Sequence, residues 1–259
     1  MEKTNKLIDY IKKFDKVGIA FSGGTDSAFL LATAVKAVGA ARVFAITVDS
    51  VLVPRKEISD AAAFAEELGV KAHIIKADAL NVEQVRQNDK TRCYHCKKNI
   101  YSSIKNKAIE LGASVIMDGK NADDEKEYRP GACAAEELSV ISPLAMFAFT
   151  KEEIRSESKR LGSATWSKPA NACLATRLPY NTEVNTDILK KIEETEILLN
   201  DVGINPVRAR VHGEILRIEA KPDDFHVIIN NKNIKEELHG LGFRYITLDL
   251  DGIRSGSMD

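Results

Sequence analysis

A short glycine loop between an apolar run and a helical pattern is the feature that most constrains the fold. Residues 17–21 read Val-Gly-Ile-Ala-Phe, and residues 22–27 follow as Ser-Gly-Gly-Thr-Asp-Ser. Apolar residues then recur at helical spacing over residues 28–38. The pattern predicts a buried strand, a tight loop and the start of a helix. Such a loop presents backbone N–H groups and the positive end of a helix dipole to an anion.

The anion that suits this loop is the phosphate chain of a nucleotide. Two adjacent glycines let the backbone approach phosphate closely. The loop lacks the Lys-Ser/Thr of the Walker sequence and looks like the shorter loop of the ATP pyrophosphatase (PP-loop) families. A generic turn in which Asp26 and Ser27 cap the helix is the simpler alternative. We favour the nucleotide loop and predict that ATP contacts Ser22, Gly23, Gly24, Thr25, Asp26 and Ser27.

Strand-like and helix-like segments alternate over the first 160 residues. Strands are predicted at residues 17–21, 43–48, 72–77 and 115–118, and helices at 56–68, 94–111 and 151–161. This alternation predicts an α/β fold with a doubly wound parallel sheet. Ligands of such sheets bind beyond the carboxyl ends of the strands. Polar residues follow two of the strands there, so Asp49, Ser50, Gly119 and Asn121 are candidate nucleotide contacts and Asp124 a candidate Mg²⁺ ligand.

The pattern changes after about residue 182. Residues 207–212 and 214–219 alternate with period two, residues 222–241 look helical, and residues 244–250 look like a last strand. We therefore predict a PP-loop domain over residues 1–180 and a small α+β domain over 181–259.

Two arginines share one face of the strand at 207–212. Arg208 and Arg210 lie with His212 on the side opposite three apolar residues. A solvated strand face is the common interpretation of such alternation. The functional interpretation is a pair of guanidinium groups that binds a phosphate.

Four cysteines stand at positions 93, 96, 133 and 173. In a reducing compartment, Cys93-x-x-Cys96 at a helix start indicates metal binding or redox chemistry, with two buried small residues as the alternative. Cys173 lies in a loop between two prolines, where Arg177 is placed to hold a thiolate or a phosphate. We interpret Cys133 as a small buried residue.

Composition limits the other classes of function. The 259 residues carry 44% hydrophobic residues and a formal net charge of −1, which argues against broad binding of nucleic acid. No stretch approaches 18 consecutive apolar residues, and the first residues lack the apolar core of a signal peptide. We expect a cytoplasmic protein without membrane contact.

A series of motifs resembles one family along nearly the whole chain. The glycine loop is followed in order by Arg92-Cys-Tyr-His-Cys-Lys97, Asp118-Gly-Lys-Asn-Ala-Asp-Asp124, Tyr128-Arg-Pro-Gly131, Ile141-Ser-Pro-Leu144, Trp166-Ser-Lys-Pro169, Cys173-Leu-Ala-Thr-Arg-Leu-Pro-Tyr180, Arg208-Ala-Arg-Val-His-Gly213 and Gly256-Ser-Met258. At these spacings the set resembles the LarE family of ATP-dependent sulfur transferases, although Thr25 stands where valine is common.

The resemblance implies a reaction and its cofactors. LarE-like enzymes use Mg-ATP to adenylate the carboxylates of a pyridine-3,5-dicarboxylate mononucleotide, and sulfur then replaces AMP to give thiocarboxylates for the nickel-pincer nucleotide cofactor of lactate racemase and related enzymes. The resemblance assigns Cys173 to sulfur transfer, and we predict that Asp26 and Arg177 are catalytic as well. Because the substrate of this family carries a phosphate, we predict that Arg208 and Arg210 bind it. It also implies a sulfide donor, and we expect a homo-oligomer.

The family delivers sulfur in two ways. In one branch the cysteine matching Cys173 gives up its own sulfur. In the other, cysteines matching Cys93, Cys96 and Cys173 hold a [4Fe–4S] cluster that carries an extra sulfide. The chain has all three and resembles the cluster branch, while Cys133 has no counterpart in the pattern.

Two other functions remain open from the residues. A PP-loop tRNA thiolase also uses Cys-x-x-Cys and a distant cysteine, but it needs a basic surface for RNA. A non-catalytic nucleotide or iron–sulfur sensor would bind the same ligands without turnover. Pyrophosphate release that depends on the pyridine substrate separates an enzyme from such a sensor.

Overall fold

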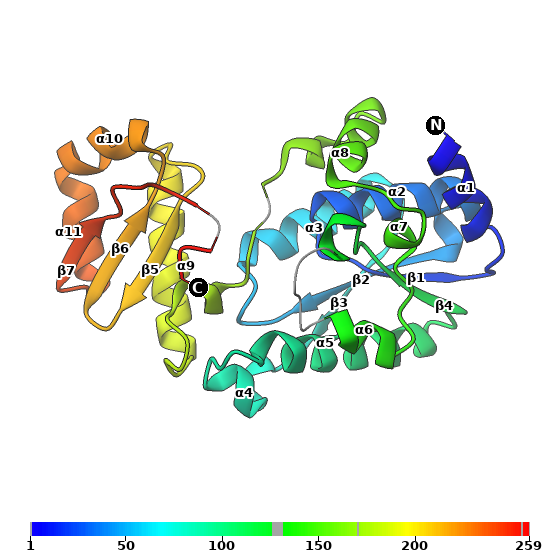
Figure 1. Cartoon of the computed structure of the whole chain (residues 1–259), viewed down its shortest axis with the longest axis horizontal. Coiled ribbons are helices and arrows are strands. Elements are labelled where there is room, and N and C mark those ends of the chain that lie inside the picture. The colour runs from blue at the N-terminus through cyan, green and yellow to red at the C-terminus, as the bar shows by residue number, and fades with distance from the viewer. Residues whose placement is uncertain (1, 126–131, 170, 255, 259) are drawn as a thin grey trace. The chain divides into compact units, whose positions relative to one another are not determined.

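The structure is a computed structural model that describes residues 2–125, 132–169, 171–254 and 256–258. Contacts divide the chain into two compact units (Figure 1). The first unit contains Met1–Val82 and Thr91–Asn171, and the second contains Glu83–Lys90 and Ala172–Asp259. The motif at residues 128–131 lies outside the described residues. The predicted boundary between residues 180 and 181 stays a prediction.

The first unit is built on a parallel four-stranded sheet. Its strands are β1 (Val17–Ala20), β2 (Val43–Asp49), β3 (Ala72–Lys76) and β4 (Val115–Asp118), in the order β3-β2-β1-β4. Every neighbouring pair is parallel, which confirms the predicted α/β sheet. Ala20, the last residue of β1, pairs with Ile46 on one side and Asp118 on the other. The loops that follow β1 and β4 therefore leave the sheet side by side.

Helices connect the strands and cover the sheet. They are α1 (Glu2–Ile11), α2 (Thr25–Val38), α3 (Arg55–Glu67), α5 (Arg92–Glu110), α6 (Ala132–Glu137), α7 (Pro143–Met146) and α8 (Lys151–Arg160), with 3₁₀ turns η1 (Ala40–Arg42), η2 (Ala79–Asn81), η3 (Asp123–Glu125) and η4 (Ala164–Ser167). Helix α8 begins with the capping box that residues 150–153 predict. Helix α5 begins two residues earlier than predicted, so both cysteines of the Cys-x-x-Cys motif lie within it.

Two apolar layers, one on each face, bury the sheet. Ala45 and Met117 belong to the core that contains residues of α1, α2, α3 and α8. Ile46 and Ile116, their neighbours in sequence, belong to the core formed with α5 and α6. Figure 1 shows α2 and α3 on one side of the sheet and α5 and α6 on the other. Adjacent strand residues point to opposite faces, so continuous apolar strands are suited to burial on both sides.

The second unit is a small α+β arrangement. Strands β5 (Arg208–His212) and β6 (Ile215–Glu219) are antiparallel, and β7 (Tyr245–Leu248) lies parallel to β6. The helical elements are α4 (Glu83–Arg86), α9 (Thr186–Asp201), α10 (Phe225–Asn230) and α11 (Lys232–Gly240), with turns η5 (Leu174–Arg177) and η6 (Pro222–Asp224). The small mixed sheet confirms the predicted fold class of this part.

The helical stretch predicted at residues 222–241 is interrupted. It consists of η6, α10 and α11, and the break falls at Asn231. The side chain of Asn231 accepts a hydrogen bond from the amide of Ile234 and caps α11. Asparagine competes with helix continuation by bonding nearby backbone in this way. None of the helices in the described ranges has the length and apolar character needed to cross a membrane.

Candidate active site

The glycine loop occupies residues 22–24, between β1 and α2. Gly23 has a φ of +73°, a conformation that favours glycine, and a Cβ at this position would lie 2.8 Å from Cβ of Ala61 in α3. Gly24 is the N-cap of α2, so no side chain covers the first-turn amides from that position. The hydroxyl groups of Ser22 and Ser27 lie 3.1 Å apart. This geometry suits a phosphate group held by backbone N–H groups.

The loop after β4 packs directly on the start of α2. A Cβ on Gly119 would lie 2.7 Å from the backbone nitrogen of Ser27. The side-chain amide of Asn121 donates to the Asp26 carboxylate at 2.8 Å. The Asn121 side-chain oxygen in turn accepts from the backbone amides of Asp123 (2.9 Å) and Asp124 (3.1 Å). The structure thus brings together four predicted site residues, from the first turn of α2 and from the segment after β4: Asp26, Gly119, Asn121 and Asp124.

We expect Gly119→Ala to weaken both nucleotide binding and stability. The added methyl group meets backbone of α2, which cannot move aside as a side-chain end can. Overpacking of this kind costs about 1–3 kcal/mol. Calorimetric titration with ATP and thermal unfolding measure the two effects. Gly240→Ala is the matched control, because a Cβ there meets no atom within 4 Å; equal behaviour of the two variants would contradict the prediction.

Asp26 is a carboxylate in a partly buried, electrostatically unfavourable setting. Burial raises its pKa above the usual value, the hydrogen bond from Asn121 lowers it, and the nearby charge of Asp124 raises it again. The Asp124 carboxylate forms an ion pair with Lys151 at 3.2 Å. Perturbed carboxylates of this kind cluster at functional sites.

No group of three or more His, Cys, Asp or Glu side chains gathers at one point among the described residues. At this pair of loops, Asp26 and Asp124 provide two carboxylates. Such a sparse donor set suits Mg²⁺, which binds through one or two carboxylates and completes its shell with phosphate oxygens and water.

Lys168 belongs to this site, although the sequence analysis assigned it no role. Its ammonium group donates to the carbonyl of Gly23 at 3.3 Å and forms an ion pair with Glu57 at 2.7 Å. The neighbouring carbonyl of Thr165 accepts from the hydroxyl of Thr25 at 2.7 Å. The Trp-Ser-Lys-Pro motif was the available signal, since it contains a basic residue but had no assigned role.

Asp49 is the last residue of β2, and Ser50 follows it at the carboxyl edge of the sheet. The guanidinium of Arg55 forms an ion pair with Asp49 and donates to the carbonyl of Ser50. Ser50 is buried, and its hydroxyl accepts from the amide of Leu52 at 3.4 Å. These contacts stabilise the turn, and a role for either residue in nucleotide binding stays a prediction.

The four cysteines differ in setting, and none is in a disulfide. Cys93 is exposed and Cys96 half-buried near the start of α5. Cys133 is exposed on α6, so its interpretation as a buried residue is wrong: the apolar side of α6 is formed by Ala134 and Ala135 instead. Cys173 is half-buried and is the N-cap of η5, in the second unit.

Among the described residues of the second unit, Arg177 is the largest fully buried side chain, with 1% of its surface exposed. Its guanidinium forms a bidentate pair with Glu196, at 2.8 and 3.1 Å. It also donates to the carbonyl of Ala172 (3.0 Å) and the hydroxyl of Thr176 (3.1 Å). The structure therefore places Arg177 as an internal support of the turn that Cys173 begins.

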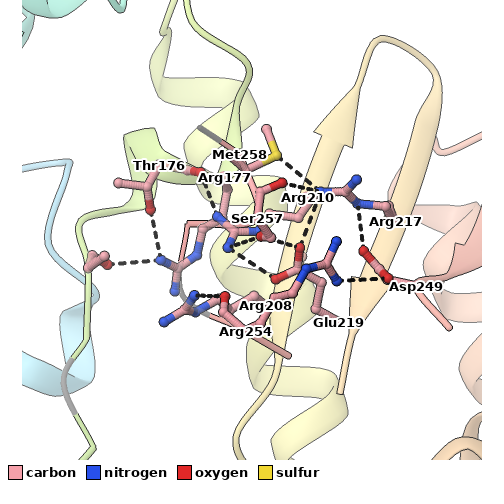
Figure 2. Close-up of polar contacts among 12 residues, drawn as sticks. Thr176, Arg177, Arg208, Arg210, Arg217, Glu219, Asp249, Arg254, Ser257 and Met258 are labelled. Carbon is pink, nitrogen blue, oxygen red and sulfur yellow. Dashed lines mark hydrogen bonds and ion pairs between the residues drawn. The ribbon is translucent and has the colours of Figure 1, made fainter. Parts of the chain in front are cut away.

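Arg208 and Arg210 lie on one face of β5, as the alternation predicts, but this face is not simply solvated (Figure 2). Arg210 is only 3% exposed and pairs with the buried Glu219 at 3.0 Å. Arg208 is half-buried and donates to the carbonyl of Arg254 at 3.1 Å. Burial lowers the pKa of Arg208, and the charge of Arg177 lowers it further. Clustered guanidinium groups favour an anionic ligand.

Comparison with known proteins gives the same result as the loop geometry. Residues 2–109 match the NAD synthase family. The chain is 35% identical to the pyridinium-3,5-bisthiocarboxylic acid mononucleotide synthase of Lactiplantibacillus plantarum, over 99% of this chain and 94% of that protein. The chain belongs to the LarE family. An uncharacterized protein of Synechocystis is 34% identical over 99% of this chain and 97% of its own length.

A further relative matches only a part of this LarE family member. The glutamine-dependent NAD(+) synthetase of Aquifex aeolicus is 38% identical over 27% of this chain and 12% of that protein. The parallel four-stranded sheet of this chain is consistent with a PP-loop domain, and the family match over residues 2–109 falls within the same unit.

Proposed function

We propose that the protein is an ATP-dependent sulfurtransferase that converts the carboxylates of a pyridine-3,5-dicarboxylate mononucleotide into thiocarboxylates. The observation that supports this most is the glycine loop joined to Asn121 through Asp26, in a chain that matches a named synthase of this class along its length. Formation of AMP and pyrophosphate fits the PP-loop family.

The oxygen of a carboxylate is a poor leaving group, and adenylation makes AMP the leaving group instead. A substrate carboxylate oxygen attacks the α-phosphorus of ATP, the bond to the β-phosphate oxygen breaks, and pyrophosphate departs. The first-turn amides of α2 and the ammonium of Lys168 lie at the glycine loop, where they would stabilise this developing negative charge. Asp26 and Asp124 would hold Mg²⁺ together with phosphate oxygens, which neutralises further charge.

Sulfur then replaces AMP at the activated carbonyl carbon. A sulfur nucleophile attacks that carbon, the bond to the AMP oxygen breaks, and a thiocarboxylate forms. Cys93, Cys96 and Cys173 would hold a [4Fe–4S] cluster with one iron open, which supplies the sulfide when the cluster is bound. The thiols of Cys93 and Cys96 suit this role, because they are three residues apart near the helix start and neither is fully buried. A sulfide donor and self-association of the chain are further parts of this proposal.

The test combines Mg-ATP with the pyridine dicarboxylate mononucleotide and measures pyrophosphate and the mass of the pyridine product. We expect pyrophosphate release that depends on the pyridine substrate, and a product in which sulfur replaces oxygen. Pyrophosphate release without the substrate, or tRNA thiolation in its place, would contradict the proposal.

The substrate phosphate provides a separate prediction. Arg208→Ala should weaken binding of the phosphorylated substrate by about 10- to 100-fold, because a charge-assisted contact is worth about 1.5–3 kcal/mol. ATP affinity should stay unchanged. Arg210→Ala should reduce affinity and also stability, since Glu219 then keeps a buried charge without this partner. Arg244→Ala, on an exposed arginine of the same unit, is the control. Equal loss of affinity for substrate and ATP would assign Arg208 to another role.

A further inference from the structure

The segment at residues 256–258, called here the closing segment, lies against the arginine face of the small sheet (Figure 2). The hydroxyl of Ser257 accepts a hydrogen bond from Nη2 of Arg210 at 2.9 Å and donates one to Oε1 of Glu219 at 2.5 Å. Nη2 of Arg217 lies 3.2 Å from the sulfur of Met258. Both ends of the Ser257 hydroxyl are thus engaged by charged groups.

Glu219 has no exposed surface and forms ion pairs with two arginines. Arg210 and Arg217 face each other across the β5–β6 register, and each forms an ion pair with Glu219, at 3.0 and 3.2 Å. Like charges directly opposite on two strands repel, so the carboxylate between them fixes their arrangement. The Arg210 guanidinium is therefore held from one side by Glu219 and Ser257.

The other end of the same guanidinium reaches the cysteine turn. Nη1 of Arg210 donates to the carbonyl of Thr176 at 2.6 Å, and the hydroxyl of Thr176 donates to the carbonyl of Cys173 at 2.8 Å. Figure 2 shows this path from the closing segment to Thr176. A turn as short as η5 has few internal hydrogen bonds, so outside contacts decide its position.

We propose that Ser257 and Glu219 are positioning residues that fix the Cys173 turn through Arg210. The inference rests on the proposed function only in taking Cys173 as a residue of sulfur transfer. The Arg177–Glu196 pair already supports this turn. The contact of Arg210 with the carbonyl of Thr176 supports it independently. Reaction geometry explains why two supports matter, since a displacement of about 1 Å can cost about 100-fold in rate.

The test measures hydrogen exchange of the η5 amides by peptide-resolved mass spectrometry, together with the rate of thiocarboxylate formation. Ser257→Ala removes the hydroxyl that Arg210 and Glu219 share. We expect exchange in the peptide covering residues 174–178 to rise about three- to tenfold, the range that one lost hydrogen bond gives. The kcat for sulfur transfer should fall about as much, with KM for ATP unchanged.

Four further variants, one of them a double variant, separate positioning from general destabilisation. Ser257→Thr keeps the hydroxyl and should restore both readouts. Arg210→Lys breaks the path, so adding Ser257→Ala to it should change exchange no further. Thr247→Val removes a hydroxyl of the same sheet that bonds the carbonyl of Leu216 and should leave the turn unchanged.

The outcomes are distinct. Unchanged exchange in Ser257→Ala, or effects that add in the double variant, would overturn the proposal. Faster exchange with an unchanged kcat would also overturn it, because the turn would then not set the rate. If exchange responds as expected but the unaltered protein transfers no sulfur, the coupling stands and the proposed function fails.

Discussion

Replacement of Asp26 by asparagine is expected to abolish pyrophosphate release while leaving the fold at least as stable. Asparagine keeps an oxygen that can accept from the Asn121 amide, which lies 2.8 Å from the carboxylate in the wild type. It removes the charge proposed to bind Mg²⁺ and the triphosphate, so the rate should fall by at least about 100-fold. Asp26→Ala should lose the rate as well, and it also loses the hydrogen bond.

The expected stability of the Asp26→Asn variant follows from the raised pKa of Asp26. When folding raises the pKa of an acid, the protonated form is favoured in the folded state. The resulting stability is fully present below the unfolded pKa and is lost as pH rises through the folded pKa. Near neutral pH the wild-type protein therefore carries an unfavourable buried charge, which the Asp26→Asn variant lacks.

Thermal unfolding without nucleotide, measured from below the unfolded pKa of Asp26 to above its folded pKa, checks the direction of this effect on stability. The melting temperature of the Asp26→Asn variant should increase relative to that of the wild type as pH rises through the raised pKa. Activity of the wild type should fall as pH drops through the same pKa. Asp9→Asn, on an exposed carboxylate of α1, is the control for loss of an aspartate. Normal turnover by Asp26→Asn would refute the assignment of the glycine loop to ATP.

Loss of any one of Cys93, Cys96 and Cys173 is expected to abolish sulfur transfer while pyrophosphate release continues. Adenylation is proposed to use the glycine loop, whereas the three thiols are proposed to serve only the second step. Anaerobically purified protein should hold about four irons per chain. Each Cys→Ala variant should lose that iron.

Cys133→Ala provides the matched control, since Cys133 is also exposed and lies on α6, which packs beside α5. It should keep both iron and sulfur transfer. A second outcome is an enzyme that holds no iron and whose Cys173 loses the mass of H₂S in one turnover. Cys173 would then give up its own sulfur, and the cluster proposal would be wrong. A closed zinc site would contradict both schemes, because such sites are structural.

Local patterns in the sequence determined the elements of the fold. Two adjacent glycines after a buried strand predict the loop, and Gly23 has the positive φ that such a loop needs. Alternating strands and helices predict the parallel sheet, because right-handed crossovers leave few other arrangements. Residues 150–153 predict the start of α8, since a capping box is a contact within four residues. All of these signals act over a short stretch of chain.

Contacts between residues far apart in the sequence could be identified only from the tertiary structure. Asn121 meets Asp26 across 95 positions, and Lys168 meets Gly23 across 145. The strand alternation places Arg208 and Arg210 on one face, but the burial of Arg210 depends on Glu219, which only the pairing of β5 with β6 brings near. Periodicity encodes which face a side chain occupies. The partner that it meets there depends on strand order, register and the path of loops, and these follow from packing of the whole unit.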